Sequence, residues 1–97
     1  MNIVFLASTV ADLRWFKRYY VSVSPEGKSK AVKQFLAILN LLKSNPRMGE
    51  YSTEHENVRE YPVLQTPFTF VYRIREDRIE ILRVADNRSN WRTQPFG

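Results

Sequence analysis

The stretch that decides the fold is TPFTFVYRIREDRIEILRVA, residues 66–85. Both halves are rich in β-branched and aromatic residues, and the charged segment REDR (75–78) separates them. Two such runs joined by a short polar segment are typical of an antiparallel β-hairpin. We therefore expect strands over residues 66–74 and 79–85, joined by a tight turn.

Alternation along these strands predicts which side chains share a face of the sheet. The covered face would carry aromatic and aliphatic side chains, namely Phe68, Phe70, Tyr72, Ile74, Leu82 and Val84. The opposite face would carry arginines beside aliphatic side chains, namely Arg73 and Arg83 with Val71 and Ile81. A surface that mixes arginine with apolar side chains is typical of an interface, but arginine stems also cover an open sheet face by themselves. The pattern leaves both interpretations open.

Two amphipathic helices are predicted before the hairpin. In residues 11–23, Leu13, Phe16 and Tyr20 recur at i, i+3 and i+7, which indicates one buried stripe. The segment SPEGKS (24–29) would interrupt the helical pattern, because proline and glycine are strong helix breakers.

The second helix is predicted over KSKAVKQFLAILNLLKS, residues 28–44. Its buried stripe would consist of apolar side chains, namely Val32, Phe35, Leu36, Leu39 and Leu42, with lysines on the opposite side. Proline disfavours the helical conformation in the residue before it, so Asn45-Pro46 would end this helix.

Two further strands complete the predicted order of elements. They are NIVFLAS (2–8) at the N-terminus and VREYPVLQ (58–65) after a polar, loop-like segment (46–57). The order β-α-α-β-β-β predicts an α+β fold, with a two-helix hairpin packed on one face of a small antiparallel sheet. A chain of 97 residues without an internal repeat is expected to form a single domain over residues 1–97.

The composition excludes several kinds of site. The chain has no cysteine and one histidine, so disulfides, thiolate metal sites and tetrahedral metal-ligand sets are not expected. It lacks the glycine-rich and nucleophile motifs of nucleotide-binding proteins and hydrolases. No apolar run approaches the ~20 residues that a membrane span needs. We therefore expect a cytoplasmic protein without cofactor, metal or membrane contact.

The charge of the chain predicts an anionic partner. The net charge is +5, and ten of the fifteen cationic side chains are arginine. Arginine presents a planar fork of donors that suits bidentate contacts to phosphate and carboxylate. The expected partner is therefore nucleic acid or an acidic protein.

Four segments together resemble the RelE/ParE superfamily of toxins from toxin–antitoxin pairs. They are NPRMG (45–49), VREYPV (58–63), TPFTFVYRIREDRIEILRV (66–84) and DNRSNW (86–91). The resemblance implies a small toxin that is neutralised by a cognate antitoxin protein. It also implies one of two activities, because RelE-like members cut mRNA on the ribosome without a metal, whereas ParE-like members poison DNA gyrase.

Individual positions favour the ParE-like side of this resemblance. Many ribonuclease members carry an arginine where this chain has Thr69, and a histidine where it has Asp86. The neighbouring arginines of the pattern are kept as Arg83 and Arg88, and Arg59 matches an arginine common in ParE-like members. A cationic scaffold without a proton carrier favours a gyrase inhibitor over an enzyme.

The resemblance implies two sets of site residues. The residues expected to bind the antitoxin or the target are Arg59, Arg73, Arg83, Asp86, Arg88 and Trp91. If the protein is instead a ribosome-dependent mRNA endoribonuclease, the catalytic set would be Tyr72, Arg73, Arg83 and Arg88. A third possibility is an inactive relative that only binds the antitoxin. In each case a partner is expected to cover exposed apolar side chains, namely Val71, Ile81, Trp15 or Trp91.

Overall fold

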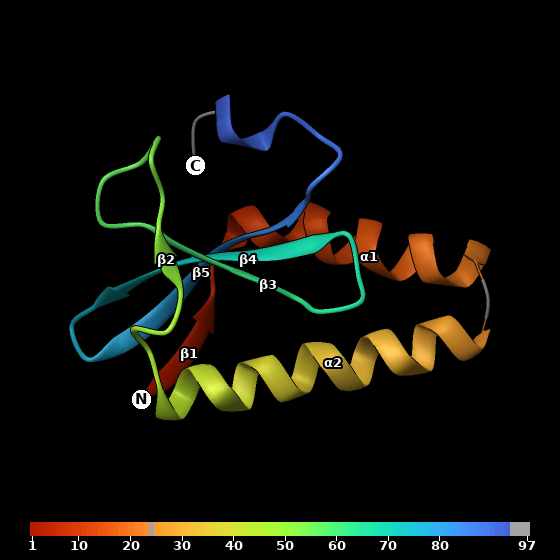
Figure 1. Cartoon of the computed structure of the whole chain (residues 1–97), viewed down its shortest axis with the longest axis horizontal. Helices are drawn as coiled ribbons and strands as arrows, with labels where there is room; N and C mark the ends of the chain where they lie inside the picture. The colour runs from red at the N-terminus through yellow and green to blue at the C-terminus, as the bar shows by residue number, and fades with distance from the viewer. Residues whose placement is uncertain (24, 94–97) are drawn as a thin grey trace.

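Two helices pack on a five-stranded sheet in the computed structural model, which describes residues 1–23 and 25–93 (Figure 1). The elements are β1 (Asn2–Phe5), η1 (Ala7–Thr9), α1 (Val10–Val23), α2 (Pro25–Ser44), β2 (Glu50–Tyr51), β3 (Arg59–Pro62), β4 (Phe68–Arg75), β5 (Arg78–Asp86) and η2 (Trp91–Thr93). This architecture confirms the predicted α+β fold. None of the helices formed by the described residues has the length and apolarity needed to cross a membrane.

The sheet is mixed rather than purely antiparallel. Its strand order is β1-β5-β4-β3-β2, and β1 runs parallel to β5 while the other neighbours are antiparallel. Parallel neighbours need a long connection between them, and α1 and α2 lie within that connection. The short strand β2 forms inside the segment that the sequence pattern indicated as a loop.

The predicted turn between β4 and β5 is confirmed. Glu76 and Asp77 at its tip have φ values of 52° and 63°, both in the left-handed region. A two-residue hairpin turn with positive φ at both positions matches the right-handed twist of the strands that it joins.

A β-bulge makes the predicted faces of Ile79, Ile81 and Leu82 wrong, whereas Val84 lies in the helix-covered core as predicted. Val71 pairs with Arg83 and the next residue, Tyr72, pairs with Ile81, so Leu82 is an extra residue in β5. An extra residue reverses the alternation of side chains on either side of it. Ile81 therefore joins the helix-covered core that Tyr72 also occupies, and Leu82 lies in a second cluster.

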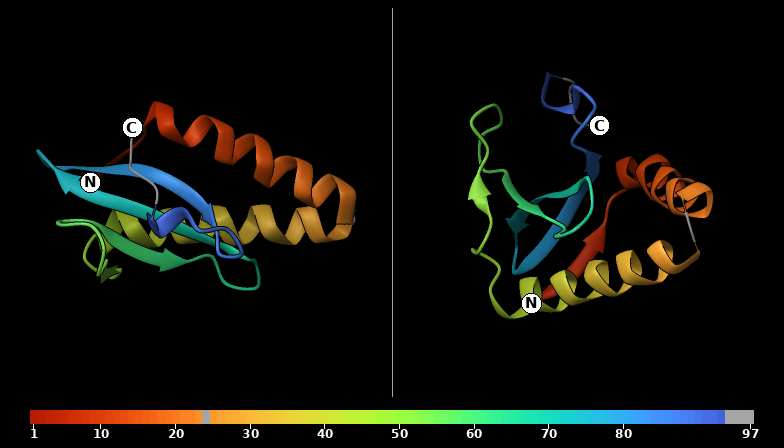
Figure 2. Two further views of the ribbon diagram at one scale, coloured as in Figure 1. Left: turned by 90° about the horizontal axis from the view of Figure 1, so that it is seen from above. Right: turned by 45° about the vertical axis from the view of Figure 1, so that its right-hand side comes forward.

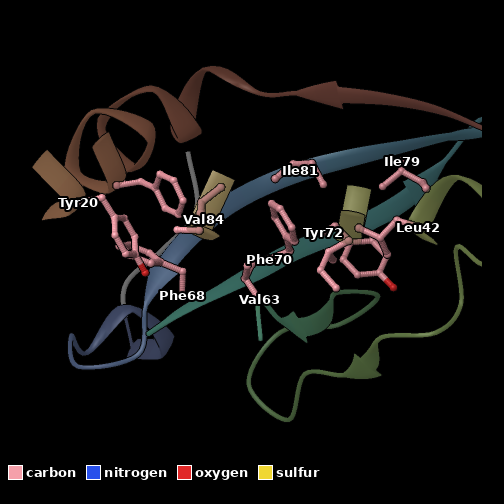
Figure 3. Packing of buried hydrophobic residues seen from close by; sticks show 12 residues of the cluster. Tyr20, Leu42, Val63, Phe68, Phe70, Tyr72, Ile79, Ile81 and Val84 are labelled. Atoms are coloured by element: carbon pink, nitrogen blue, oxygen red, sulfur yellow. The ribbon is translucent and has the colours of Figure 1, made fainter. Parts of the chain in front are cut away.

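The helix-covered core is aromatic. Phe16 and Tyr20 of α1 contact Phe68 of β4, with ring centroids 4.9 Å and 6.2 Å from that of Phe68 (Figure 3). Phe35 of α2 contacts Phe70 with ring centroids 4.8 Å apart. Offset or edge-to-face aromatic pairs at these separations stabilise a core beyond their buried area. The predicted stripe of α1 is thus confirmed.

The predicted stripe of α2 is rotated from the observed one. Among the described side chains of α2, Ala31, Ile38 and the predicted Leu42 are buried, and the predicted Phe35 and Leu39 pack against the core. The predicted Val32 and Leu36 are instead exposed. The helix also begins at Pro25, because proline is well tolerated in the first turn of a helix. Residues 25–29 of the predicted break are therefore helical, and Ser24 lies outside the described residues.

The second face of the sheet is closed by a smaller cluster. It consists of Val58, Val71, Leu82, Ala85 and Trp91, with Leu6 packed against them. Figure 2 shows η2, which carries Trp91, on a different side of β4 and β5 from the helices. Val71, Ile81 and Trp91 are each 0% exposed, so the prediction that they form an open patch is wrong. Trp15 alone of that set is exposed.

Candidate functional site

Side chains of η1 and of the first turn of α1 supply hydrogen-bond partners to the edge of β5. The register of β1 with β5 ends at Ile81, so the later edge of β5 needs other partners. Ser8 Oγ donates to the carbonyl of Leu82 at 2.7 Å, and Asp12 Oδ2 accepts from the backbone N–H of Val84 at 2.9 Å. The edge of β5 is thereby covered by polar side chains rather than by a strand.

Asp12 also holds Arg83 in a bidentate ion pair. Arg83 Nε and Nη2 donate to the two carboxylate oxygens of Asp12 at 2.7 Å and 2.8 Å. These bonds stabilise the charged guanidinium and raise the pKa of Arg83 further above its ordinary value. Alternation along β5 predicted Arg83 on an open sheet face, and it could not reveal this partner, which lies 71 residues earlier in the chain.

Asp86 is the centre of a second polar cluster, at the end of β5. Its carboxylate accepts from Arg88 Nε and Nη2 at 2.9 Å and 2.7 Å, and from Trp15 Nε1 at 2.9 Å. The bonds from Arg88 hold the pKa of Asp86 well below its usual range, and the Trp15 bond lowers it further. The guanidinium of Arg88 lies 4.7 Å from the ring centroid of Tyr19.

We call this region the β5-edge site. It is a shallow pocket lined by Asp12, Trp15, Tyr19, Arg83, Asp86, Arg88 and Ser89. The α1 members follow the helical spacing i, i+3 and i+7, so one stripe of α1 lies along the edge of β5. Two carboxylates neutralise two guanidiniums there. The structure thus brings together three of the predicted site residues, Arg83, Asp86 and Arg88, as internally paired groups.

Arg73 is held by a different carboxylate. Its Nε donates to Glu80 at 2.6 Å, and Arg78 also donates to Glu80 at 2.6 Å. The hydrogen bond from Arg73, followed by that from Arg78, lowers the pKa of Glu80 although its side chain is only 2% exposed. Arg73 was a predicted site residue and Glu80 was not, although the two residues lie directly opposite each other on β4 and β5.

Arg59 donates to carbonyl oxygens rather than to a carboxylate. Its Nη1 contacts the carbonyls of Arg47 and Gly49 at 3.1 Å and 2.8 Å, and its guanidinium lies 3.9 Å from the ring centroid of Tyr51. Arg59 therefore fixes the segment between α2 and β2 to β3. It lies away from the β5-edge site, in a hollow that it shares with Arg73.

The hydroxyl of Tyr72, a member of the predicted nuclease set, is hydrogen-bonded within the fold. Its hydroxyl donates to the carbonyl of Pro46 at 2.9 Å and accepts from the N–H of Gly49 at 2.9 Å. Burial is the main reason that the pKa of Tyr72 is raised. A Cβ at Gly49 would lie 2.5 Å from the Tyr72 hydroxyl oxygen, so this close approach requires glycine. Of the predicted nuclease set, Arg83 and Arg88 line the β5-edge site, whereas Arg73 lines a different hollow and Tyr72 lines neither.

A further hollow surrounds Thr69, the position where ribonuclease relatives were expected to carry arginine. Three glutamates line it, namely Glu50, Glu54 and Glu60, together with Arg92. Arg92 is paired with Glu60 at 2.8 Å, and Thr69 donates to Asn87 at 2.7 Å. The charge of this hollow is therefore negative. No local sequence pattern predicts this arrangement, because the glutamates lie in separate segments of the chain.

The comparison with known families decides the relationship. Residues 3–91 match the family described as the ParE toxin of the type II toxin–antitoxin system, parDE. The chain belongs to the ParE toxin family. A solved structure of the chromosomal ParDE toxin–antitoxin system from P. aeruginosa resembles it with a TM-score of 0.72 and 28% identity, covering 89% of this chain and 95% of that chain. None of the curated proteins matches the sequence. This chain is therefore a ParE-type toxin of a type II toxin–antitoxin system, and the predicted superfamily is confirmed.

Proposed function

We propose that this ParE-family toxin inhibits DNA gyrase by binding it, and that it does not cut RNA. The ParE family relationship supports the gyrase part of the proposal, and the negative hollow lined by Thr69 is the observation against RNA cleavage. Catalysis of phosphodiester cleavage needs cations around the reacting phosphate and a group that moves protons. Glu50, Glu54 and Glu60 would instead repel an RNA phosphate.

The β5-edge site supports the same proposal. Asp86 occupies the place of the proton-carrying histidine, and its lowered pKa keeps it ionised near neutral pH. Arg83 and Arg88 are each paired with a carboxylate, so they would have to leave those partners to neutralise a phosphate. The site is therefore suited to holding α1 against β5 and presenting a fixed surface.

A supercoiling assay with purified gyrase and relaxed plasmid tests the proposal. We expect the toxin to reduce supercoiling and to trap cleaved plasmid on gyrase. The matched experiment adds the toxin to a translating extract and maps mRNA ends by primer extension. New cuts in the ribosomal A site, with normal supercoiling, would establish the endoribonuclease alternative and overturn the proposal. Neither effect, together with no growth arrest on induction, would indicate an inactive relative.

We further propose where the antitoxin binds. A groove between the edge strand β1 and α2 is lined by apolar side chains that include Val4, Phe5, Leu36 and Leu39. Val4, Phe5 and Leu36 are exposed, and β1 has β5 on one side only. A protein partner can fill such a groove and add a strand to such an edge. We therefore propose that the antitoxin occupies this groove.

We also propose that the toxin acts in the cytoplasm, because gyrase and its DNA are found there.

The antitoxin proposal is tested by substituting two exposed leucines. Leu36→Glu places a charge in the groove and should weaken co-purification of the antitoxin encoded beside the toxin. Leu64→Glu is the control, because Leu64 is 53% exposed, compared with 54% for Leu36, and does not line the groove. Equal antitoxin binding by the two variants would show that the groove is not the interface.

A further inference from the structure

The arginines of this chain divide into paired and unpaired groups. Five of them form ion pairs within the described residues, namely Arg73, Arg78, Arg83, Arg88 and Arg92. Within the same part of the chain, the five without a carboxylate partner are Arg14, Arg18, Arg47, Arg59 and Arg75. The last three of these line one hollow together with Arg73. Unpaired guanidiniums from distant parts of the sequence are thus gathered at one place.

This arginine hollow is partly preorganised. Arg59 is fixed by its bonds to the carbonyls of Arg47 and Gly49, and Arg73 is fixed by Glu80. Each fixed guanidinium has donors beyond those that these bonds use. Arg47 and Arg75 are exposed and complete the lining. Such a site binds an anion at a smaller entropic cost than free surface cations would.

The charges of the arginine hollow favour a chain of phosphates over a single carboxylate. Arg47, Arg59 and Arg75 line it without a carboxylate partner, Arg73 is paired with Glu80, and Glu56 supplies the one carboxylate among the lining residues. The positive charge that remains exceeds what one bound carboxylate compensates, whereas a nucleic-acid strand supplies a negative charge at each nucleotide. The lining also includes few apolar anchors, which a protein partner would need at the core of its interface.

We propose that the arginine hollow binds the phosphates of a single-stranded nucleic acid, with a base on Tyr51. The ring of Tyr51 is 65% exposed and lines both the arginine hollow and the negative hollow that Thr69 lines. Arg59 lies against it, 3.9 Å from its centroid, so the phosphates would follow the arginine side of this ring. Bases stack on exposed aromatic side chains with little dependence on sequence. This inference does not depend on gyrase as the target, because the toxin alone carries every residue involved.

The test measures the fluorescence anisotropy of a labelled oligothymidylate with the full chain at several salt concentrations. Arg47→Gln with Arg75→Gln removes two exposed guanidiniums that no ion pair needs, so the fold should be retained. We expect this double variant to bind at least about tenfold more weakly, with a salt slope smaller by about 1.4. Tyr51→Ala should weaken binding about fivefold or more.

The control is Arg14→Gln with Arg18→Gln on α1, which changes the net charge by the same amount. These exposed arginines lie outside the hollow, so this variant should keep the affinity within about twofold of the parent. Equal losses in the two double variants would mean attraction by total charge only, and would overturn the proposal. Tighter binding of poly-glutamate than of oligothymidylate at the hollow would overturn it in favour of an acidic protein.

Discussion

Asp12 accepts hydrogen bonds from two kinds of donor, the guanidinium of Arg83 and the backbone N–H of Val84. One residue therefore joins the first turn of α1 to the edge of β5 through both a charged and a neutral contact. A carboxylate in this position is sensitive to removal, because its loss leaves a half-buried cation and a buried N–H without partners.

Removing the Asp12 carboxylate should destabilise the fold strongly. We expect Asp12→Ala to lower the free energy of unfolding by about 2–4 kcal/mol. Asp12→Asn should have a stability between those of the parent and of Asp12→Ala, because its amide oxygen can still accept the hydrogen bond from Val84. Urea denaturation followed by circular dichroism measures this change. Glu26→Gln, an exposed acid in the first turn of α2, serves as the control and should have little effect. A similar loss in both variants would contradict the role of Asp12.

Asp86 should make stability depend on pH in the acid range. Its pKa is lowered in the folded protein, chiefly by Arg88, so the folded state favours the ionised carboxylate. This contribution is complete above the unfolded pKa of about 3.9 and is lost as pH falls through the folded pKa. Stability measured between pH 6 and pH 3 should therefore fall less in Asp86→Asn than in the parent. Parallel curves for the two proteins would show that Asp86 is not responsible.

At the scale of elements, α2 differs from its sequence-based prediction by a rotation. Val32 and Leu36 match the apolar period, yet both are exposed, while Ala31 and Ile38 are buried. Five apolar positions at helical spacing predict a helix but do not fix its rotation about the axis. The reason is that apolar side chains of α2 line the exposed groove beside β1 as well as the core. The sequence therefore predicted that α2 exists, and only the packing against β1 and β4 shows which side is inside.

The rotation of α2 can be tested with two neighbouring positions. Ile38 is 3% exposed and Leu36 is 54% exposed. Ile38→Ala should lower the free energy of unfolding by about 2–5 kcal/mol, whereas Leu36→Ala should lower it by less than about 1 kcal/mol. Chemical denaturation of both variants decides the matter, and the reverse order would restore the predicted stripe.

The hairpin shows where sequence patterns stop being informative. The strands, the turn at Glu76-Asp77 and the aromatic face of β4 follow from local alternation and were predicted correctly. The bulge at Leu82 could not be predicted from alternation, because every residue from Ile79 to Val84 except two is apolar. The partners of Arg83 and Asp86 also lie on α1, so no local pattern could reveal the β5-edge site.

At the scale of the whole molecule, charge is distributed unevenly. The helical segments α1 and α2 contain seven cationic and two acidic residues, which accounts for the entire net charge of +5. The remaining chain has equal numbers of each sign. Two copies of this protein therefore repel each other mainly through the positive charge of α1 and α2. Added salt screens this repulsion.

Salt should therefore promote self-association of the toxin in the absence of its antitoxin. The edge strand β1 and the exposed Phe5 and Leu36 offer a surface that two copies can share once repulsion is screened. Light scattering should show a larger mean mass at high salt, and Phe5→Lys should suppress the increase. A mass independent of salt in both proteins would argue against this use of β1.

The bulge in β5 has a consequence for how chain length can vary among relatives. Losing Leu82 would restore regular pairing with β4, because Ile81 and Arg83 would still lie opposite Tyr72 and Val71. The second cluster would then lack one of its buried side chains, whereas an added residue in β5 would reverse the faces of the side chains beyond it. Insertions and deletions are therefore expected in the segment between β2 and β3, and evolution should keep the length of β5 constant.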